Sequence, residues 1–196
     1  MTKKKIKSEL KHCGVNVTID EGVIIQHPER VSIGDNVHLS YGCKIYANDA
    51  SSSVNLLPTP YIEIGDGSHI KENAVLNTYG GFIRLGKNSV IGQNCVIYGH
   101  GGVTIGDNSG LAPLSLISAA NYVLDDDLSV PARKSGETKK GVVIGDNVIC
   151  SGGTIICDGV CIGRNVVIGA GSVLRKDIPD NAVAFGNPAQ IAYIRK

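Results

Sequence analysis

A four-residue phrase, an aliphatic residue followed by Gly and then two small or polar residues, recurs along the chain. Its copies begin at Ile33, Ile64, Leu85, Ile91, Ile105, Ile144, Ile162 and Ile168. Two neighbouring pairs, 85 with 91 and 162 with 168, are six residues apart, and the copies at 144 and 162 are separated by three such steps. A fixed short period of this kind is typical of solenoids, so the period constrains the fold before any other feature is considered.

The C-terminal part of the chain indicates what each period builds. From residue 144 to residue 174, every sixth position carries a large apolar residue or Cys. Four positions after each of these comes a mostly small or β-branched residue, namely Val148, Thr154, Val160, Val166, Ser172 and Ile178. Two inward residues separated by one outward residue are typical of a short strand, and the intervening Gly, Asp and Asn suit corners. Three such sides predict a triangular coil of about eighteen residues, whereas helical spacing does not fit.

The same phase continues upstream with interruptions. Polar stretches at 46–61 and 118–141 break it, and Gly99–Gly102 contains a two-residue insertion. Long non-repeating excursions in a compact solenoid are usually functional. We expect an all-β chain with one β-helix domain over 1–196. Its parts are an N-terminal extension at 1–14, coils at 15–178 with the two loops, and a C-terminal segment at 179–196.

Charge and hydropathy narrow the function classes. The net charge is +1, with 19 basic and 18 acidic residues, which gives no electrostatic footprint for nucleic acid. No apolar run is long enough to span a bilayer, and the N-terminus lacks the apolar region of a signal peptide. We therefore expect a cytoplasmic protein with neither a nucleic-acid nor a membrane partner.

The six cysteines invite a metal or disulfide hypothesis. Cys43, Cys95 and Cys150 fall on inward positions, where a free thiol packs as a small apolar group. Cys157 and Cys161 lie off those positions, and a lone pair four residues apart is weak evidence for zinc. We expect cysteines that pack and no bound metal.

Several ordered motifs carry a resemblance to a known family. They are 105–108, the loop residues Pro131 and Arg133, and the segments 141–148, 168–173, 176–179 and 186–189. The chain resembles the hexapeptide-repeat acyltransferases, and more narrowly the maltose, galactoside and polysaccharide-biosynthesis acetyltransferase branch. The resemblance implies a left-handed parallel β-helix, a homotrimer, and acetyl-CoA bound in the groove between neighbouring prisms.

The resemblance also implies which residues meet the cofactor. Ser151 and Ala170 fall at or near positions that contact it in the family, and Gly152 and Gly169 would let an extended pantetheine arm approach the backbone. The basic residues for the CoA phosphates would be Arg175, Lys176 and Arg195. Arg195 can equally be part of a solvated charged terminus. Asp125 and Arg133 are the candidate acceptor-binding residues of the long loop.

One position departs from the family pattern. In this branch the long loop carries Ser, any residue, Asn-His, any residue, Phe and Asp, and the His is the general base. The corresponding segment here is 118–125, in which Asn121 matches and Tyr122 stands where the His belongs. A tyrosine with a pKa near 10 is a poor base at neutral pH, whereas a histidine near 6.5 is well placed.

Three explanations stay open for this departure. In the first, His100, flanked by glycines at a break in the register, supplies the base. In the second, the acceptor is an amine, which needs less help from a base than a hydroxyl does. In the third, the protein is a catalytically inactive binding or scaffold module.

We expect an acyltransferase that moves an acetyl or other short acyl group from acyl-CoA to a sugar or nucleotide-sugar hydroxyl or amine. The setting would be surface-glycan biosynthesis. His100 would act as the base, Asn121 would hydrogen-bond the acceptor or the thioester, and Tyr122 would hydrogen-bond or stack on a sugar ring.

Overall fold

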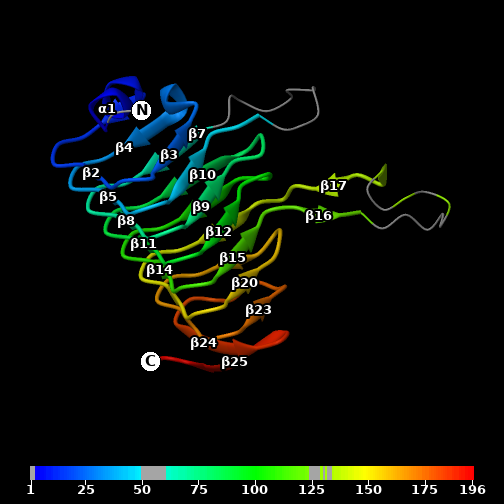
Figure 1. The fold of residues 1–196 in the computed structure, drawn as a ribbon. Helices are drawn as coiled ribbons and strands as arrows, with labels where there is room; N and C mark the ends of the chain where they lie inside the picture. The colour runs from blue at the N-terminus through cyan, green and yellow to red at the C-terminus, as the bar shows by residue number, and fades with distance from the viewer. Residues whose placement is uncertain (1–2, 50–60, 124–128, 130, 132–133) are drawn as a thin grey trace.

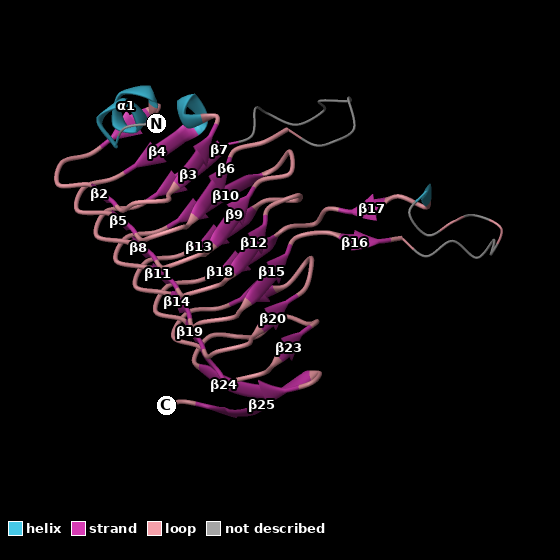
Figure 2. Ribbon diagram, in the orientation of Figure 1, coloured by secondary structure: helices cyan, strands magenta, loops and turns pink. Residues whose placement is uncertain are grey.

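The computed structural model describes residues 3–49, 61–123, 129, 131 and 134–196. The described chain winds into a prism with three parallel β-sheets as its faces (Figures 1 and 2). The expected left-handed parallel β-helix is confirmed. The helix α1 (Lys3–Glu9) covers the N-terminal end, where Ile6 joins the core.

Each face collects one strand from every coil. The first face contains, in order, β1 (His12–Cys13), β4 (Val31–Ile33), β7 (Tyr61–Ile64), β10 (Phe82–Leu85), β13 (Val103–Ile105), β18 (Val142–Ile144) and β21 (Cys161–Ile162). The second face contains β2 (Thr18–Ile19), β5 (His38–Leu39), β8 (His69–Ile70), β11 (Val90–Ile91), β14 (Gly110–Leu111), β19 (Ile149–Cys150), β22 (Val167–Ile168), β24 (Ala182–Gly186) and β25 (Ala189–Ile194). The third face contains β3 (Ile24–Gln26), β6 (Lys44–Tyr46), β9 (Val75–Asn77), β12 (Val96–Tyr98), β15 (Leu116–Ser118), β20 (Ile155–Ile156) and β23 (Val173–Leu174). Neighbouring strands pair in parallel, except that β25 turns back antiparallel against β24 at the C-terminal end.

The inward positions predicted from the period form the core. Ile144, Ile156 and Leu174 are at most 2% exposed, and the small residues of the same hexads are buried with them. Two of these small residues are polar, and each hydroxyl donates to a carbonyl three residues earlier: Thr154 to Ser151 and Ser172 to Gly169, both at 2.6 Å. The burial of these hydroxyls therefore leaves no donor unsatisfied. Cys43, Cys95 and Cys150 are buried free thiols, as predicted.

The coils differ in length at only one edge of the prism. Four residues connect the first face to the second, and four connect the second to the third, in coil after coil from β4 to β23. The connections from the third face back to the first vary in length, and we call this corner the insertion edge. Its segments include 27–30, containing the 3₁₀ turn η1 (Pro28–Arg30), together with 47–60, 78–81, 99–102 and 119–141. Stacked coils therefore place the described residues of these insertions along one edge.

The register confirms the predicted coil of eighteen and measures the departures from it. Val143 pairs with Cys161 eighteen residues on, whereas Arg84 pairs with Thr104 after twenty residues. That longer step confirms the two-residue insertion at 99–102. Glu63 pairs with Arg84 after twenty-one residues, which reveals an insertion at 78–81 that the hexad analysis missed.

The longest insertion leaves the prism as a hairpin. β16 (Asn121–Tyr122) and β17 (Glu137–Thr138) pair antiparallel and project away from the coils (Figures 1 and 2). We call this hairpin the arm. The sequence predicted only a loop over 118–141, and the paired strands are a feature that the hexad period does not encode.

Among the described residues, the longest helix is α1, and no helix has the length and apolar character needed to cross a membrane.

Candidate active site

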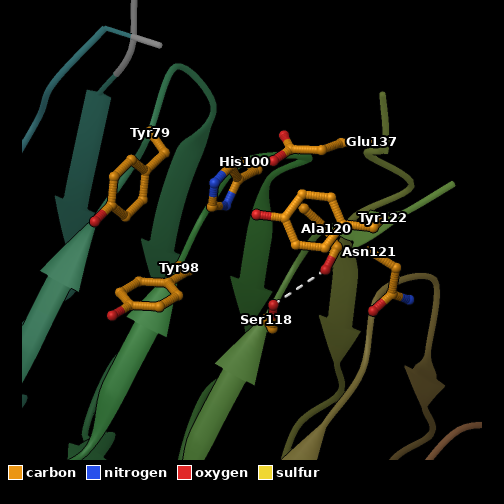
Figure 3. Close-up of a pocket in the computed structure, with 8 residues that line it drawn as sticks. All are labelled: Tyr79, Tyr98, His100, Ser118, Ala120, Asn121, Tyr122 and Glu137. Atoms are coloured by element: carbon orange, nitrogen blue, oxygen red, sulfur yellow. Dashed lines mark hydrogen bonds between the residues drawn. The ribbon is translucent and has the colours of Figure 1, made fainter. Parts of the chain in front are cut away.

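A cavity of about 440 Å³ lies on the insertion edge where the arm leaves the prism (Figure 3). Its lining comes from three successive coils and both strands of the arm. The lining residues are Tyr79, Tyr98, His100, Ser118, Ala120, Asn121, Tyr122 and Glu137. The structure thus brings His100, Asn121 and Tyr122, the three residues predicted to be catalytic, into one cavity.

His100 lies in the tight turn between β12 and β13. Glycine is required beside it, because Gly102 has a φ of +93° and a Cβ there would come within 2.4 Å of the Phe82 ring. The imidazole stacks on the Tyr79 ring, with centroids 4.6 Å apart and planes 12° from parallel. The Tyr98 ring stands edge-on to both, at 6.3 Å from His100 and 5.2 Å from Tyr79. These contacts hold the imidazole in one orientation.

The imidazole of His100 is only partly accessible to water. Among the described residues, no group hydrogen-bonds its buried Nδ1 atom. Burial lowers the pKa of His100, and the positive charge of Lys139 adds to this, while Glu137 and Asp158 oppose it. The ring is therefore neutral at pH 7, the state in which it can accept a proton.

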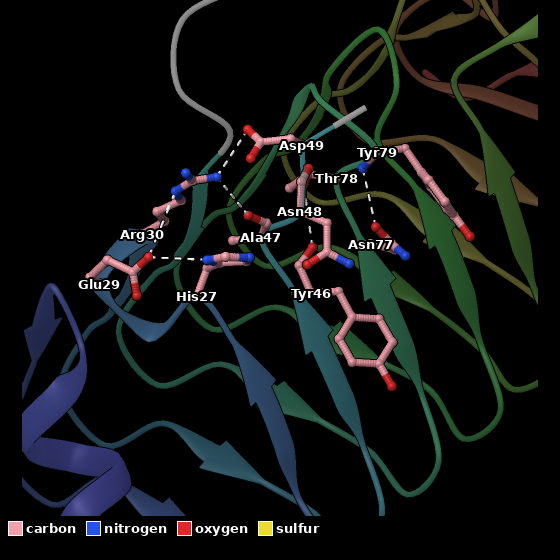
Figure 4. A network of polar contacts seen from close by, with 10 residues as sticks. All are labelled: His27, Glu29, Arg30, Tyr46, Ala47, Asn48, Asp49, Asn77, Thr78 and Tyr79. Atoms are coloured by element: carbon pink, nitrogen blue, oxygen red, sulfur yellow. Dashed lines mark hydrogen bonds and ion pairs between the residues drawn. The ribbon is translucent and has the colours of Figure 1, made fainter. Parts of the chain in front are cut away.

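Tyr79 is held in an unusual backbone conformation by buried polar neighbours. Its φ is +44°, in the left-handed region that non-glycine residues seldom occupy. The Tyr79 N–H donates to Oδ1 of Asn77 at 3.1 Å, and Thr78 donates its hydroxyl to the Asn48 carbonyl at 2.7 Å. The Gly80 N–H donates to the same carbonyl at 2.9 Å. The ring that stacks on His100 is thus fixed from the preceding coil (Figure 4).

The same network continues to the first coil. Arg30, the last residue of the turn η1, donates to Oδ1 of Asp49 at 3.1 Å and to the Ala47 carbonyl at 3.4 Å. Its guanidinium also lies 3.8 Å from the carboxylate of Glu29, which contacts His27 (Figure 4). Residues 47–49, which begin the second insertion, are therefore bound on one side to Arg30 and on the other to Thr78.

The arm supplies the opposite side of the cavity. Tyr122 is 57% exposed and faces Glu137 across the antiparallel pair, while Asn121 is paired with Thr138. Figure 3 shows the Tyr122 ring over the cavity on the side away from Tyr79. An exposed phenol can hydrogen-bond or stack on a bound ligand.

Asp158, in the next coil of the insertion edge, fixes the base of the arm. Its carboxylate accepts the Thr138 hydroxyl at 2.8 Å and the N–H groups of Lys140 and Gly141 at 2.9 Å each. Bonds from donors to an ionised carboxylate are stronger than neutral ones. The arm is thus anchored where its second strand returns to the prism.

The residues predicted to bind the cofactor lie on different corners. Ser151–Gly152 and Gly169–Ala170 occupy consecutive coils at the corner between the second and third faces, where the Ser151 N–H donates to the carbonyl of Ile168 at 3.0 Å. A Cβ on Gly169 would lie 2.7 Å from Cβ of Phe185, so the packing of β24 by itself requires glycine there.

The predicted basic residues do not form one cluster. Arg175 and Lys176 follow β23 on the insertion edge and are exposed. Arg195 lies at the corner between the first and second faces, where its N–H donates to the Asn181 carbonyl at 2.8 Å and its guanidinium donates to the Asn165 carbonyl. Asp125 and Arg133, the predicted acceptor contacts, lie outside the described residues.

Among the described residues, no group of three or more His, Cys, Asp or Glu side chains could hold a metal ion. The chemistry available in the cavity is that of a neutral imidazole, a carboxylate, an amide and phenols.

Sequence reasoning missed Tyr79, Tyr98 and Glu137 as parts of the cavity. The sequence does contain a signal for Tyr79: the copies of the repeated phrase at Ile64 and Leu85 are twenty-one residues apart, three more than a complete coil, which indicates an insertion between them. Glu137 had none, since it reaches the cavity only because the arm folds back on itself.

Known proteins resemble this chain in sequence and in fold. The family model described as the hexapeptide repeat of succinyl-transferase matches residues 82–112. The galactoside O-acetyltransferase of Escherichia coli is 34% identical over 147 residues, which cover 74% of this chain and 70% of that protein. The galactoside O-acetyltransferase of Lactococcus lactis is 33% identical over 138 residues, which cover 70% of this chain and 65% of that protein.

Among solved structures, the D94N variant of AntD, an N-acyltransferase from Bacillus cereus in complex with dTDP and coenzyme A, has a similar fold. The TM-score is 0.68 at 20% identity, and the superposition covers all of this chain and 91% of the other.

Proposed function

The chain belongs to the hexapeptide-repeat acyltransferase superfamily of CoA-dependent enzymes, and we propose that it acylates a sugar or nucleotide sugar in the cavity beneath the arm. The transferred group is acetyl or another short acyl group. The observation that carries this proposal is the position of His100, which faces the same cavity as Tyr122, the residue in the usual place of the base.

The related proteins support the choice of substrates. The two bacterial relatives are named for acetyl transfer to galactosides, and the Bacillus cereus N-acyltransferase was crystallised with coenzyme A and dTDP. The names and ligands of these related proteins support acyl-CoA as the donor and a sugar or nucleotide sugar as the acceptor. A role in surface-glycan biosynthesis belongs to the same proposal.

His100 acts as the general base in this proposal. The acceptor oxygen or nitrogen attacks the thioester carbonyl, and its proton passes to the neutral imidazole. The C–S bond of the tetrahedral intermediate then breaks, and the departing thiolate receives the proton as free CoA. Asn121 hydrogen-bonds the acceptor or the thioester, and Tyr122 packs on the sugar from the exposed side.

Acyl-CoA would bind in the groove between neighbouring prisms. Ser151, Gly152 and Ala170 are proposed contacts of the pantetheine arm, and Gly169 is proposed with them although β24 already requires it to be small. Arg175 and Lys176, on the insertion edge toward the C-terminal end, are proposed to meet the CoA phosphates. Arg195 lies at another corner of the prism, so its proposed phosphate contact does not share a site with those two residues of the same protomer. Asp125 and Arg133 remain proposed contacts of the acceptor.

Assembly and location are part of the same proposal. Exposed apolar residues stand on the second and third faces, including Ile149 at 55% exposed and Ile155 at 37%, and a homotrimer would cover such residues. All six cysteines are free thiols, a state typical of a reducing compartment such as the cytoplasm.

An inactive scaffold is the second candidate, because Tyr122 replaces the usual histidine and Nδ1 of His100 lacks a partner among the described residues. Acetyl-CoA turnover against a panel of sugars and nucleotide sugars separates the two, with product mass as the readout. We expect His100→Ala to lower kcat by about 10²- to 10⁴-fold while the Kd for acetyl-CoA, measured by calorimetry, is unchanged.

His12→Ala is the matched control, since His12 lies on the first face in the first coil, and it should leave kcat unchanged. An unaltered kcat in His100→Ala would remove His100 from the mechanism. A wild-type protein that binds no acetyl-CoA at millimolar concentration would favour the scaffold.

A further inference from the structure

We propose that the acceptor of this cavity is a protonated amine, carried on a sugar, and that Glu137 together with the rings of Tyr79 and Tyr98 recognises it. This inference rests on the acyl transfer proposed above and specifies its substrate class. It follows from the chemistry of the lining, the position of the single carboxylate in the described lining and the state of the imidazole.

The lining of the cavity is rich in aromatic rings. Three tyrosines and one histidine surround the cavity, with Tyr79 and Tyr98 on one side and Tyr122 on the other (Figure 3). The Tyr79 and Tyr98 rings both line the cavity and stand 86° apart, and the imidazole of His100 covers one face of the Tyr79 ring. Aromatic faces carry negative electrostatic potential and attract cationic groups, while the rest of the ring packs on the sugar.

The charge in the cavity favours a cationic ligand. Glu137 is the one charged side chain among the described lining residues. Its only described cationic partner is Lys139, whose Nζ lies 3.6 Å from Oε2 in an ion pair that is 35% exposed on both sides. That contact is longer than a good charge-assisted hydrogen bond, so an ammonium group in the cavity can compete for the carboxylate. A neutral hydroxyl can also donate a hydrogen bond to this carboxylate, but an ammonium group adds ion-pair attraction to the hydrogen bond.

The protonation state of His100 also suits an ammonium acceptor. His100 is neutral because burial lowers its pKa, so it does not repel an ammonium group, even though the carboxylates of Glu137 and Asp158 act in the opposite direction. Lowering the pKa also makes the imidazole a weaker base. A weaker base suits an ammonium proton, which is released near neutral pH, better than the proton of a sugar hydroxyl.

The reaction balances with these groups alone. The ammonium group gives one proton to His100, and the freed nitrogen lone pair forms the C–N bond with the thioester carbon. The C–S bond breaks, and the thiolate takes the second proton from the nitrogen. The products are the amide and free CoA, and His100 returns its proton to water.

The test uses matched acceptor pairs with the full-length protein and acetyl-CoA. Each pair consists of an amino sugar with its amino group at C2, C3 or C4 and the corresponding hydroxyl sugar, offered free and linked to UDP or dTDP. We expect at least one amine to be acetylated with a kcat/KM more than 10-fold above that of its hydroxyl partner. Acetylation of hydroxyl acceptors only would overturn the amine assignment and leave the acyl transfer standing. Absence of transfer to every acceptor would instead refute the proposed function.

Glu137→Gln tests the recognition step directly. The substitution keeps the size of the side chain and removes its charge, so we expect KM for the amine to rise about 10-fold with a smaller change in kcat. Glu63→Gln is the matched control, because Glu63 pairs with Arg84 on the first face away from the cavity. An equal KM for the amine in Glu137→Gln and in the wild type would overturn the assignment of Glu137.

Discussion

Tyr79 offers the sharpest test of how the cavity sets the chemistry of His100. Its ring covers one face of the imidazole at 4.6 Å and only 12° from parallel, and its backbone is fixed by Asn77 and Thr78. Tyr79→Ala removes this cover without altering the imidazole itself. A stacked aromatic pair contributes about 0.5–1.5 kcal/mol beyond its buried area. If all of this stacking free energy serves to orient the imidazole, its loss lowers kcat/KM by about 2- to 13-fold at high pH, where His100 is neutral.

The dependence on pH separates this role from a merely structural one. Burial is the main cause that lowers the pKa of His100, and loss of the Tyr79 ring admits water to one face of the imidazole. The pKa therefore rises toward its ordinary value. Because the base works only when it is deprotonated, the acid limb of the kcat/KM profile moves to higher pH. Activity at pH 6 should accordingly fall by a larger factor than activity at pH 8.

The measurement is the pH profile of kcat/KM from pH 5 to pH 9 for three variants. Tyr79→Phe keeps the ring and should leave the acid limb where it is in the wild type. Tyr46→Ala is the matched control, since this third-face tyrosine contributes only its backbone carbonyl to Thr78 and lies outside the cavity lining. An acid limb that does not move in Tyr79→Ala, with kcat/KM within 2-fold of the wild type, would refute the reasoning.

Two further predictions concern the arm and the thiols. Asp158→Asn replaces a carboxylate that accepts hydrogen bonds from three donors, so the base of the arm should loosen. We expect faster hydrogen exchange at 137–141 and about a 10-fold lower kcat/KM, and unchanged exchange there would contradict the anchoring role. Alkylation of the native protein at pH 8, followed by peptide mass, should modify exposed Cys161 first. The reason is that burial raises the pKa of the Cys43 thiol and of the Cys150 thiol to about 12. Equal alkylation rates at the three thiols would contradict the buried positions of Cys43 and Cys150.

Tyr122, at the position where the family has a histidine, shows what the resemblance predicts and what the structure adds. The segment around Asn121 identifies the place of the usual base, and Tyr122 shows that the base is absent from it. The sequence offered His100 as a replacement because it interrupts the period. The structure adds that the two residues share one cavity, although they belong to different coils and one of them stands on the arm.

The predicted cofactor contacts show a second limit to what the sequence alone can reveal. Gly152 and Gly169 are predicted cofactor contacts because small residues on an outer corner would let a ligand approach the backbone. The structure gives Gly169 a second reason to be glycine, since β24 packs the Phe185 side chain against it. One residue type can satisfy two requirements, and the sequence does not distinguish them.

The sequence by itself determined the coil, the inward residues and the places where the period breaks. It could do so because each strand and corner is encoded within six residues, and the large and small inward positions recur locally. The three-dimensional arrangement decided the site. Stacking places insertions that are twenty or more residues apart along one edge, so that Tyr79 meets His100. Antiparallel pairing then returns Glu137 to the cavity opposite Tyr122. Both events depend on contacts between distant segments, and no local pattern records them.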